Sequence, residues 1–206
     1  MANENNAQVA TMRVWDRFVR VFHWALVVAF TAAYLLSEDE TLTFHTWAGY
    51  TVASLVLARI AWGFVGPRHA RFADFVYRPS KALTYLKNLV LLRAERYLGH
   101  SPAGGLMVVA LLASLLLTAG SGLAYYGTRN ETDAVASYVS RDLLGFKPTI
   151  ASRLRDTGNR DLKEIHETFG NISLILIFAH IGGVVLASFA HRENLVRAMV
   201  TGDKRR

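Results

Sequence analysis

Two histidines in one long apolar run, His166 and His180, are the residues of this chain best suited to chemistry. They are fourteen positions apart. Fourteen helical residues turn through about 1400° and rise ~21 Å, so both imidazoles lie within ~40° of the same face. Ionisable side chains are costly inside a hydrocarbon core, and their presence there indicates a function. Neutral imidazole binds iron well and is a common axial ligand of haem. The spacing therefore predicts a helix that carries one ligand of each of two stacked haem sites.

The composition favours a membrane protein over a soluble domain. The chain has 206 residues, of which 52% are hydrophobic, and its mean hydropathy is +0.22. It has no cysteine, which excludes disulfides, thiolate-held iron–sulfur clusters and the covalent attachment of c-type haem. The net charge of +7 is explained below by membrane topology, so we expect no nucleic-acid partner.

Four segments are long and apolar enough to cross a bilayer in a single membrane domain over residues 1–206. The predicted spans are residues 18–36, 44–65, 104–126 and 166–190. The first span resembles a signal peptide, because Arg13, Arg17 and Arg20 precede its apolar run. No clear small-residue cleavage site follows it, so we expect it to be retained.

The distribution of Lys and Arg predicts the orientation. Basic residues gather before the first span, in loop 66–102 and after the fourth span, whereas loop 37–43 has three acids and no base. Loop 127–165 is balanced, with seven bases and six acids, and long loops obey the rule weakly. We therefore expect a multi-pass protein of the bacterial inner membrane, with both termini and loop 66–102 cytoplasmic and loop 127–165 outside.

Both long loops contain helical patterns. Residues 82–98 alternate apolar and basic side chains at helical spacing, which is typical of an amphipathic helix on the inner membrane surface. A helix packed on the ends of the bundle is the alternative. The outer loop has short helical fragments near 134–144 and 149–155, and its length suits a cap or docking surface.

Alternating span directions pair the histidines by depth. His23 and His180 fall toward the cytoplasmic side, and His45 and His166 fall toward the outer side. Two histidine pairs at two depths predict two bis-imidazole haem sites between facing helices. The predicted fold is an all-α integral membrane four-helix bundle with two haems between the helices. Six-coordinate iron leaves no open position, so such haems carry electrons.

Two glycines follow outer histidines by four residues, Gly49 after His45 and Gly170 after His166. Positions i and i+4 share a helix face, so these glycines leave room for a flat macrocycle. Helix–helix contact is the alternative, because glycine is common at such contacts in membranes.

Two arginines are further candidates for the cofactor environment. Arg59 lies fourteen residues after His45 and faces the same way near the inner site. A buried guanidinium needs an anionic partner, such as a haem propionate or a quinone headgroup, unless it reaches the inner interface. Basic residues near propionates, such as Arg20 and Arg59, raise a haem potential.

The remaining histidines fit other roles. His191 follows the fourth span, and His69 and His100 lie among Gly, Pro and Ser in the basic loop, where turn or surface positions are expected. The third span has no histidine, and we expect it to complete the bundle and wall a haem.

The sequence resembles the bacterial cytochrome b561 proteins and the related cytochrome b subunits of nickel–iron hydrogenases. The matching stretches are RVFHWALV, FHTWAGY, WGFVGPRHARF, YLGHSPAGGLMV and IHETFGNISLILIFAHIGGVVLASFAHRENLVRAM. They touch all four spans but not the outer loop. The resemblance implies a four-helix bundle with two b haems that works with a membrane quinone. It implies the iron ligands to be His23, His45, His166 and His180.

These observations predict a di-haem b-type cytochrome that moves electrons across the inner membrane. The expected partners are membrane lipid, a quinone (ubiquinone or menaquinone), and a hydrogenase or c-type cytochrome. One alternative is a subunit that only anchors and wires such a complex, without quinone turnover of its own. Whether the chain is an enzyme is therefore left open. A second alternative is a haem-free transporter or metal channel that uses the same histidines.

Overall fold

The computed structural model describes residues 11–37, 42–129, 133–143, 145 and 151–205, and for 151–159 it describes the backbone alone. The three acids of the first loop, at 38–40, lie outside the described residues. Residues 149–150 of the predicted fragment 149–155 also lie outside them.

Four long helices dominate the described chain. They are α1 (Arg17–Leu35), α2 (Leu42–Val65), α5 (Pro102–Arg129) and α7 (Ala151–Ala190). Each contains an apolar stretch long enough to cross a membrane. Large apolar side chains on them remain exposed, among them Val28 at 69% and Phe189 at 72%, because lipid tails are as apolar as a protein interior. The predicted all-α membrane fold is confirmed.

Shorter elements connect and cap the long helices. They are β1 (Thr11–Arg13), α3 (Phe72–Phe75), α4 (Pro79–Val90), α6 (Ala134–Tyr138), the π-helical turn η2 (Val139–Leu143), α8 (Leu195–Thr201) and β2 (Asp203–Arg205). The predicted fragment 134–144 corresponds to α6 and η2. Residues 151–155 belong to α7, which begins well before the predicted span at 166. A helix need not end at the membrane surface, because its backbone hydrogen bonds are internal.

The chain divides into two compact units, and each long helix contributes to both. Unit 1 comprises residues 1–23, 61–107 and 180–206, and unit 2 comprises residues 24–60 and 108–179. The single membrane domain over 1–206 stays a prediction.

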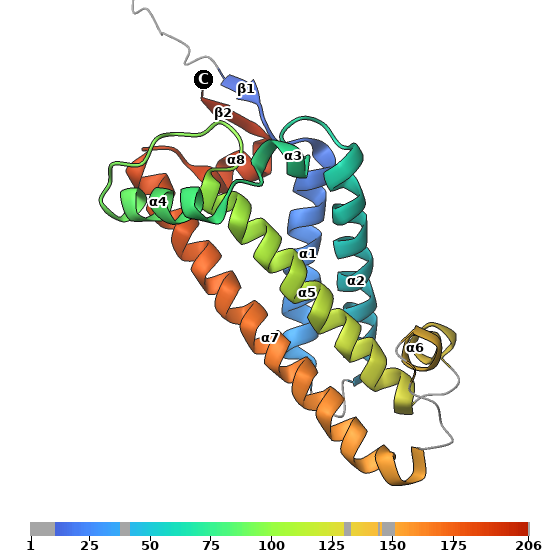
Figure 1. Ribbon diagram of the computed structural model, residues 1–206. Coiled ribbons are helices and arrows are strands. Elements are labelled where there is room, and N and C mark those ends of the chain that lie inside the picture. Colours follow the sequence, from blue (N-terminus) through green and yellow to red (C-terminus); the bar gives the residue numbers. More distant parts are fainter. Residues whose placement is uncertain (1–10, 38–41, 130–132, 144, 146–150, 206) are drawn as a thin grey trace, which may run out of the picture. The chain divides into compact units, whose positions relative to one another are not determined.

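Unit 1 joins the two ends of the described chain. β1 pairs antiparallel with β2, with Met12 opposite Lys204 (Figure 1). Gly202 ends α8 at a positive φ of 90°, and its carbonyl accepts hydrogen bonds from the backbone of Val14 at 2.9 Å and Trp15 at 3.1 Å. The ribbon adjoins an apolar cluster of Val14, Trp15, Val19, Ala70 and Ala198.

Within unit 1, helix α4 packs against its neighbours through a stripe of apolar side chains. Ala82, Tyr85 and Leu89 are buried, and the hydroxyl of Tyr85 lies 3.2 Å from Nε2 of His191. Burial raises the pKa of Tyr85 and lowers that of His191, so both groups are neutral near pH 7. The contact holds α4 beside the residue that directly follows α7.

In unit 2, polar contacts tie α5 to α7 and α6 to its neighbours. The hydroxyls of Ser114 on α5 and Ser173 on α7 lie 2.7 Å apart and are buried. A Cβ at Gly127 would collide with the carbonyl of Ala136, so α6 packs closely on the end of α5 (Figure 1). Asp133 caps α6 by accepting from the backbone N–H of Ala136 at 2.9 Å.

Candidate functional site

The predicted outer histidines face each other within unit 2. His45 lies near the start of α2 and His166 lies on α7. Their ring centroids are 5.9 Å apart and their planes are nearly perpendicular, at 88°. The structure thus brings together the two residues that depth alone pairs in the sequence.

Each outer imidazole is oriented by a backbone carbonyl. Nδ1 of His45 lies 2.7 Å from the carbonyl oxygen of Ala33, and Nδ1 of His166 lies 2.8 Å from that of Thr118. A carbonyl can only accept, so both Nδ1 atoms donate. That tautomer leaves the lone pair of Nε2 available to a metal, and such second contacts are usual for metal-binding histidines.

The predicted inner histidines face each other within unit 1. His23 lies on α1 and His180 lies on α7. Their ring centroids are 6.4 Å apart, with an angle of 55° between the planes. Helix α7 therefore contributes one histidine to each pair, and α1 and α2 contribute the opposite members.

The comparisons with known proteins agree on one family. The profile described as Prokaryotic cytochrome b561 matches residues 14–202. The chain belongs to the prokaryotic cytochrome b561 family. It is 22% identical to a probable Ni/Fe-hydrogenase B-type cytochrome subunit of Rhizobium leguminosarum bv. viciae, over 93% of this chain and 87% of the relative. It is also 22% identical to a protein of the same description from Bradyrhizobium diazoefficiens, over 94% of this chain and 86% of the relative. No solved structure matches the chain significantly.

As a member of the cytochrome b561 family, the chain is a multi-pass membrane protein of electron transfer, and haem b is the group that its family implies. The predicted family is confirmed.

The separation of each histidine pair suits a haem iron. A metal–imidazole bond is about 2 Å long, so two nitrogens on opposite sides of one ion lie about 4 Å apart. Each ring centroid is set back by roughly one ring radius, which places the centroids about 6 Å apart. The observed 5.9 Å and 6.4 Å are close to that distance. Both pairs therefore fit a group that needs two axial protein ligands.

In the described part of the chain, no three or more His, Asp or Glu side chains form a metal-binding group. A haem does not need one, because its macrocycle supplies the equatorial ligands.

The glycines of the outer pair border open space. A Cβ built on Gly49 or on Gly170 would meet nothing within 4 Å, which is the room that a macrocycle beside His45 and His166 requires. Their part in holding a cofactor stays a prediction. Gly122 on α5 was missed from the sequence. A Cβ there would lie 2.8 Å from Cε1 of His166, and no spacing rule connects a third-span glycine with that ring.

The two candidate arginines occupy different surroundings. Nη1 of Arg20, in unit 1, donates to the carbonyl of Val200 at 2.7 Å, which ties α1 to α8. Arg59, in unit 2, is only 2% exposed, so α2 carries a buried guanidinium. The proximity of either side chain to a propionate or quinone stays a prediction.

The remaining histidines have packing contacts in unit 1. His100 lies between the rings of Trp15 and Phe75, with centroids at 4.7 and 4.4 Å. A Cβ on Gly99 would lie 2.9 Å from Nδ1 of His69. His69 lies in a turn, as expected, whereas His100 packs against aromatic rings instead of lying in a turn or at the surface. His191 contacts Tyr85.

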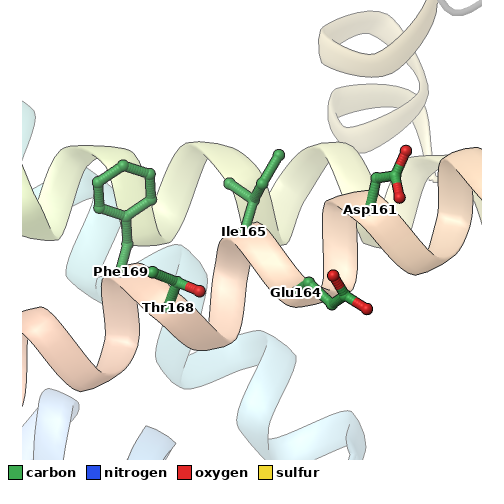
Figure 2. Close-up of a pocket in the computed structure, with 5 residues that line it drawn as sticks. All are labelled: Asp161, Glu164, Ile165, Thr168 and Phe169. Atoms are coloured by element: carbon green, nitrogen blue, oxygen red, sulfur yellow. The ribbon is translucent and has the colours of Figure 1, made fainter.

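A hollow on α7 lies beside the outer pair in sequence but on another face. Its lining residues are Asp161, Glu164, Ile165, Thr168 and Phe169 (Figure 2). Their spacing of three and four residues marks one stripe of the helix. Neither His45 nor His166 is among the residues that line the hollow.

Proposed function

We propose that this chain is a di-haem b-type cytochrome that moves electrons across the bacterial inner membrane between a quinone and a redox partner. One observation carries the proposal: α7 supplies His166 to one close pair of imidazoles and His180 to another. In this proposal His45 and His166 hold the outer haem, and His23 and His180 hold the inner haem.

The chain's own residues would hold each iron and limit its chemistry. Haem iron, when bound, supplies a reversible one-electron change. The two histidines of each pair would hold one iron, and an iron held in this way would serve electron transfer. The carbonyls of Ala33 and Thr118 accept from the outer imidazoles, which makes both imidazoles stronger electron donors. Arg20 and Arg59 would act as cationic neighbours that favour the reduced state.

The orientation follows from the basic residues. With both termini and loop 66–102 in the cytoplasm, the His23–His180 pair lies toward the cytoplasm and the His45–His166 pair toward the outside. Electrons would pass from one pair to the other along α7.

Helix α4 would lie in the cytoplasmic membrane surface. Its buried apolar stripe is continuous with a second stripe of Leu83, Leu86 and Val90, which are 65, 47 and 63% exposed. The helix contains lysines but no acid, which suits anionic lipid headgroups. The contact between Tyr85 and His191 places α4 next to the end of a span, and the exposed apolar stripe favours the membrane surface over packing on the end of the bundle.

Single cysteines can test the position of α4, because the chain has no native cysteine. A fluorophore on Leu86→Cys should be quenched by a quencher attached to lipid tails. The same fluorophore on Thr84→Cys, on the opposite face, should not. Equal quenching at both positions would contradict the interfacial placement.

Haem quantitation tests the main proposal. Purified protein should show a reduced b-type α band and two haems per chain by the pyridine haemochrome assay. One haem per chain, or none, would contradict the proposal, and a haem-free protein would support the transporter or channel alternative.

The second candidate function is a subunit that anchors and wires a hydrogenase or a c-type cytochrome, without quinone turnover. The names of the two relatives favour this alternative. Exposed apolar side chains in the outer loop, Val135, Tyr138 and Leu143, are 56, 61 and 67% exposed and offer a docking surface.

Quinol assays distinguish the two candidates. If isolated di-haem protein is reduced by ubiquinol or menaquinol, the quinone role holds. If reduction requires a partner, and Val135→Ser with Tyr138→Ser abolishes co-purification of that partner, the wiring role holds. The same pair of substitutions should leave the haem content unchanged.

A further inference from the structure

We propose that α5, the span without a histidine, orients His166 in three ways. A backbone carbonyl accepts a hydrogen bond from the imidazole, a glycine leaves room for the ring, and buried hydroxyls, which we call the clasp, join α5 to α7. The inference rests on the proposed function, because it assigns α5 a positioning role for the outer iron ligand. All of its contacts lie within unit 2.

The backbone acceptor is the carbonyl of Thr118. It accepts from Nδ1 of His166 at 2.8 Å, while the hydroxyl of Ser121 has a shorter contact with the carbonyl of Leu117, at 2.7 Å. A helical carbonyl has two lone pairs, so one can accept the bond within the helix and the other can accept from His166. The second bond forms only if α5 holds Thr118 at the correct height and rotation relative to the imidazole.

The clearance is at Gly122, one turn after Thr118 on the same face of α5. A Cβ at this position would lie 2.8 Å from Cε1 and 2.9 Å from Nδ1 of His166. Real Cβ atoms are not found so close to a ring, so the imidazole would have to move. Glycine thus lets α5 approach the ring closely enough for the Thr118 carbonyl to accept.

The clasp joins α5 to α7 one turn or more away from the histidine. The Ser114 and Ser173 hydroxyls are 2.7 Å apart, and those of Ser173 and Thr118 are 3.2 Å apart. The Thr118 hydroxyl donates to the carbonyl of Ser114 at 2.9 Å. Because each hydroxyl has one hydrogen, the donors run from Ser114 to Ser173 to Thr118.

The clasp sets the register of the two helices. Ser173 is 0% and Ser114 5% exposed, so sliding α5 along α7 would leave buried hydroxyls unsatisfied. Such interhelical bonds stabilise contacts in membranes. The register that satisfies the hydroxyls is also the one that brings the Thr118 carbonyl to His166.

Gly122→Ala and Gly120→Ala form a matched pair for the test. Both substitutions add one methyl group to α5 and raise helix propensity equally. A Cβ at Gly120 meets nothing within 4 Å, and Gly120 lies ~160° around the helix from Gly122. The measurements are haem content, the low-spin EPR spectrum, and a potentiometric titration that resolves two haems.

We expect Gly122→Ala to shift the EPR signal and raise the midpoint potential of one haem, because His166 loses its Nδ1–H acceptor and becomes a weaker electron donor. Gly120→Ala should reproduce the wild-type values. An unchanged Gly122→Ala spectrum, an equal response of both haems, or the same shift in Gly120→Ala would overturn the inference.

A second variant decides the matter if Gly122→Ala does not accumulate. Ser173→Ala removes the central hydroxyl of the clasp, and Thr51→Ala removes a hydroxyl that donates within its own helix, to the carbonyl of Trp47 at 2.9 Å. Ser173→Ala alone should shift the same haem; wild-type values in it would overturn the inference. If wild-type protein lacks two haems, the proposed function fails instead, so the two failures are distinguishable.

Discussion

The two histidine pairs are alike in separation, but the two units that contain them are held together by different kinds of polar contact. In unit 2, His45 and His166 are held by uncharged backbone carbonyls, and buried hydroxyls join the helices nearby. In unit 1, the segments that follow His180 are held by charges. Glu193 pairs with Arg96 at 3.3 Å and with Lys204 at 3.5 Å.

The difference follows from the cost of burying a charge within the membrane. A charge within the hydrocarbon region is costly, so the outer pair is oriented by groups that helices already provide. Glu193 follows the end of α7 and lies beyond the membrane-spanning stretch. Burial alone would raise the pKa of Glu193, but Arg96 and Lys204 outweigh that effect and hold its pKa below the ordinary value.

Removing one member of a pair should have the largest effect and tests whether the two sites are independent. His45→Ala should lose the outer haem and His180→Ala the inner haem, so that haem content falls from two per chain to one. His191→Ala is the control, because its imidazole contacts Tyr85, and should retain both haems. Loss of both haems in each ligand variant would mean that the sites are not separate.

Filling the open space beside the outer pair should have the next largest effect. Gly170→Leu places a side chain where the structure has room, so the protein should still fold and insert. We expect haem content to fall toward one per chain, with the inner haem retained. Gly120→Leu, on α5 and also bordered by open space, is the comparison. Two haems in Gly170→Leu would contradict the prediction that a macrocycle occupies this space.

Breaking the charge cluster should destabilise unit 1 without removing the outer haem. The side chains of Glu193 and Lys204 are 7 and 5% exposed, so Glu193→Ala leaves a buried lysine unpaired, at a cost of about 3 kcal/mol. Limited proteolysis should then cut the C-terminal segment faster. Asp203→Asn removes a pair with Arg13 that is 61 and 40% exposed, and its effect should stay below about 1 kcal/mol.

The same cluster predicts a pH dependence. A carboxylate whose folded pKa is depressed stabilises the protein above its unfolded pKa, and this contribution is lost as the pH falls through the folded value. Glu193→Gln cannot titrate, so its C-terminal segment should already be more protease-sensitive than wild type at neutral pH, and acid should increase that sensitivity less than it does in wild type. Identical acid profiles would show that Glu193 does not control the segment.

The smallest expected effect concerns the cap of α6. The Tyr50 hydroxyl donates to Asp133 at 2.7 Å. The backbone N–H of Ala136, with the Tyr50 hydroxyl second, holds the pKa of Asp133 below its usual value. Tyr50→Phe should destabilise the docking of α6 by about 1 kcal/mol. Hydrogen exchange of the α6 amides should rise accordingly, and unchanged exchange would contradict this role. Exchange around His23 should not change.

Most of the predictions made from the sequence rest on local patterns. Spans, orientation and pairing depth depend on hydrophobicity, charge and helical periodicity, which are properties of short segments. Contacts between distant segments have no such signal: β1 and β2 are joined across almost the whole chain, and Gly122 meets His166 from a span whose composition is only apolar.

The sequence by itself determined the four apolar helices and which histidines share a depth, because a bilayer forces alternating spans of nearly constant length. Only the tertiary structure decided which atoms orient the imidazoles: the carbonyls of Ala33 and Thr118 for the outer pair. Every residue has a carbonyl, so residue type cannot mark the one that a histidine will meet. Helix register decides it, and in unit 2 that register is held by the contacts between α5 and α7.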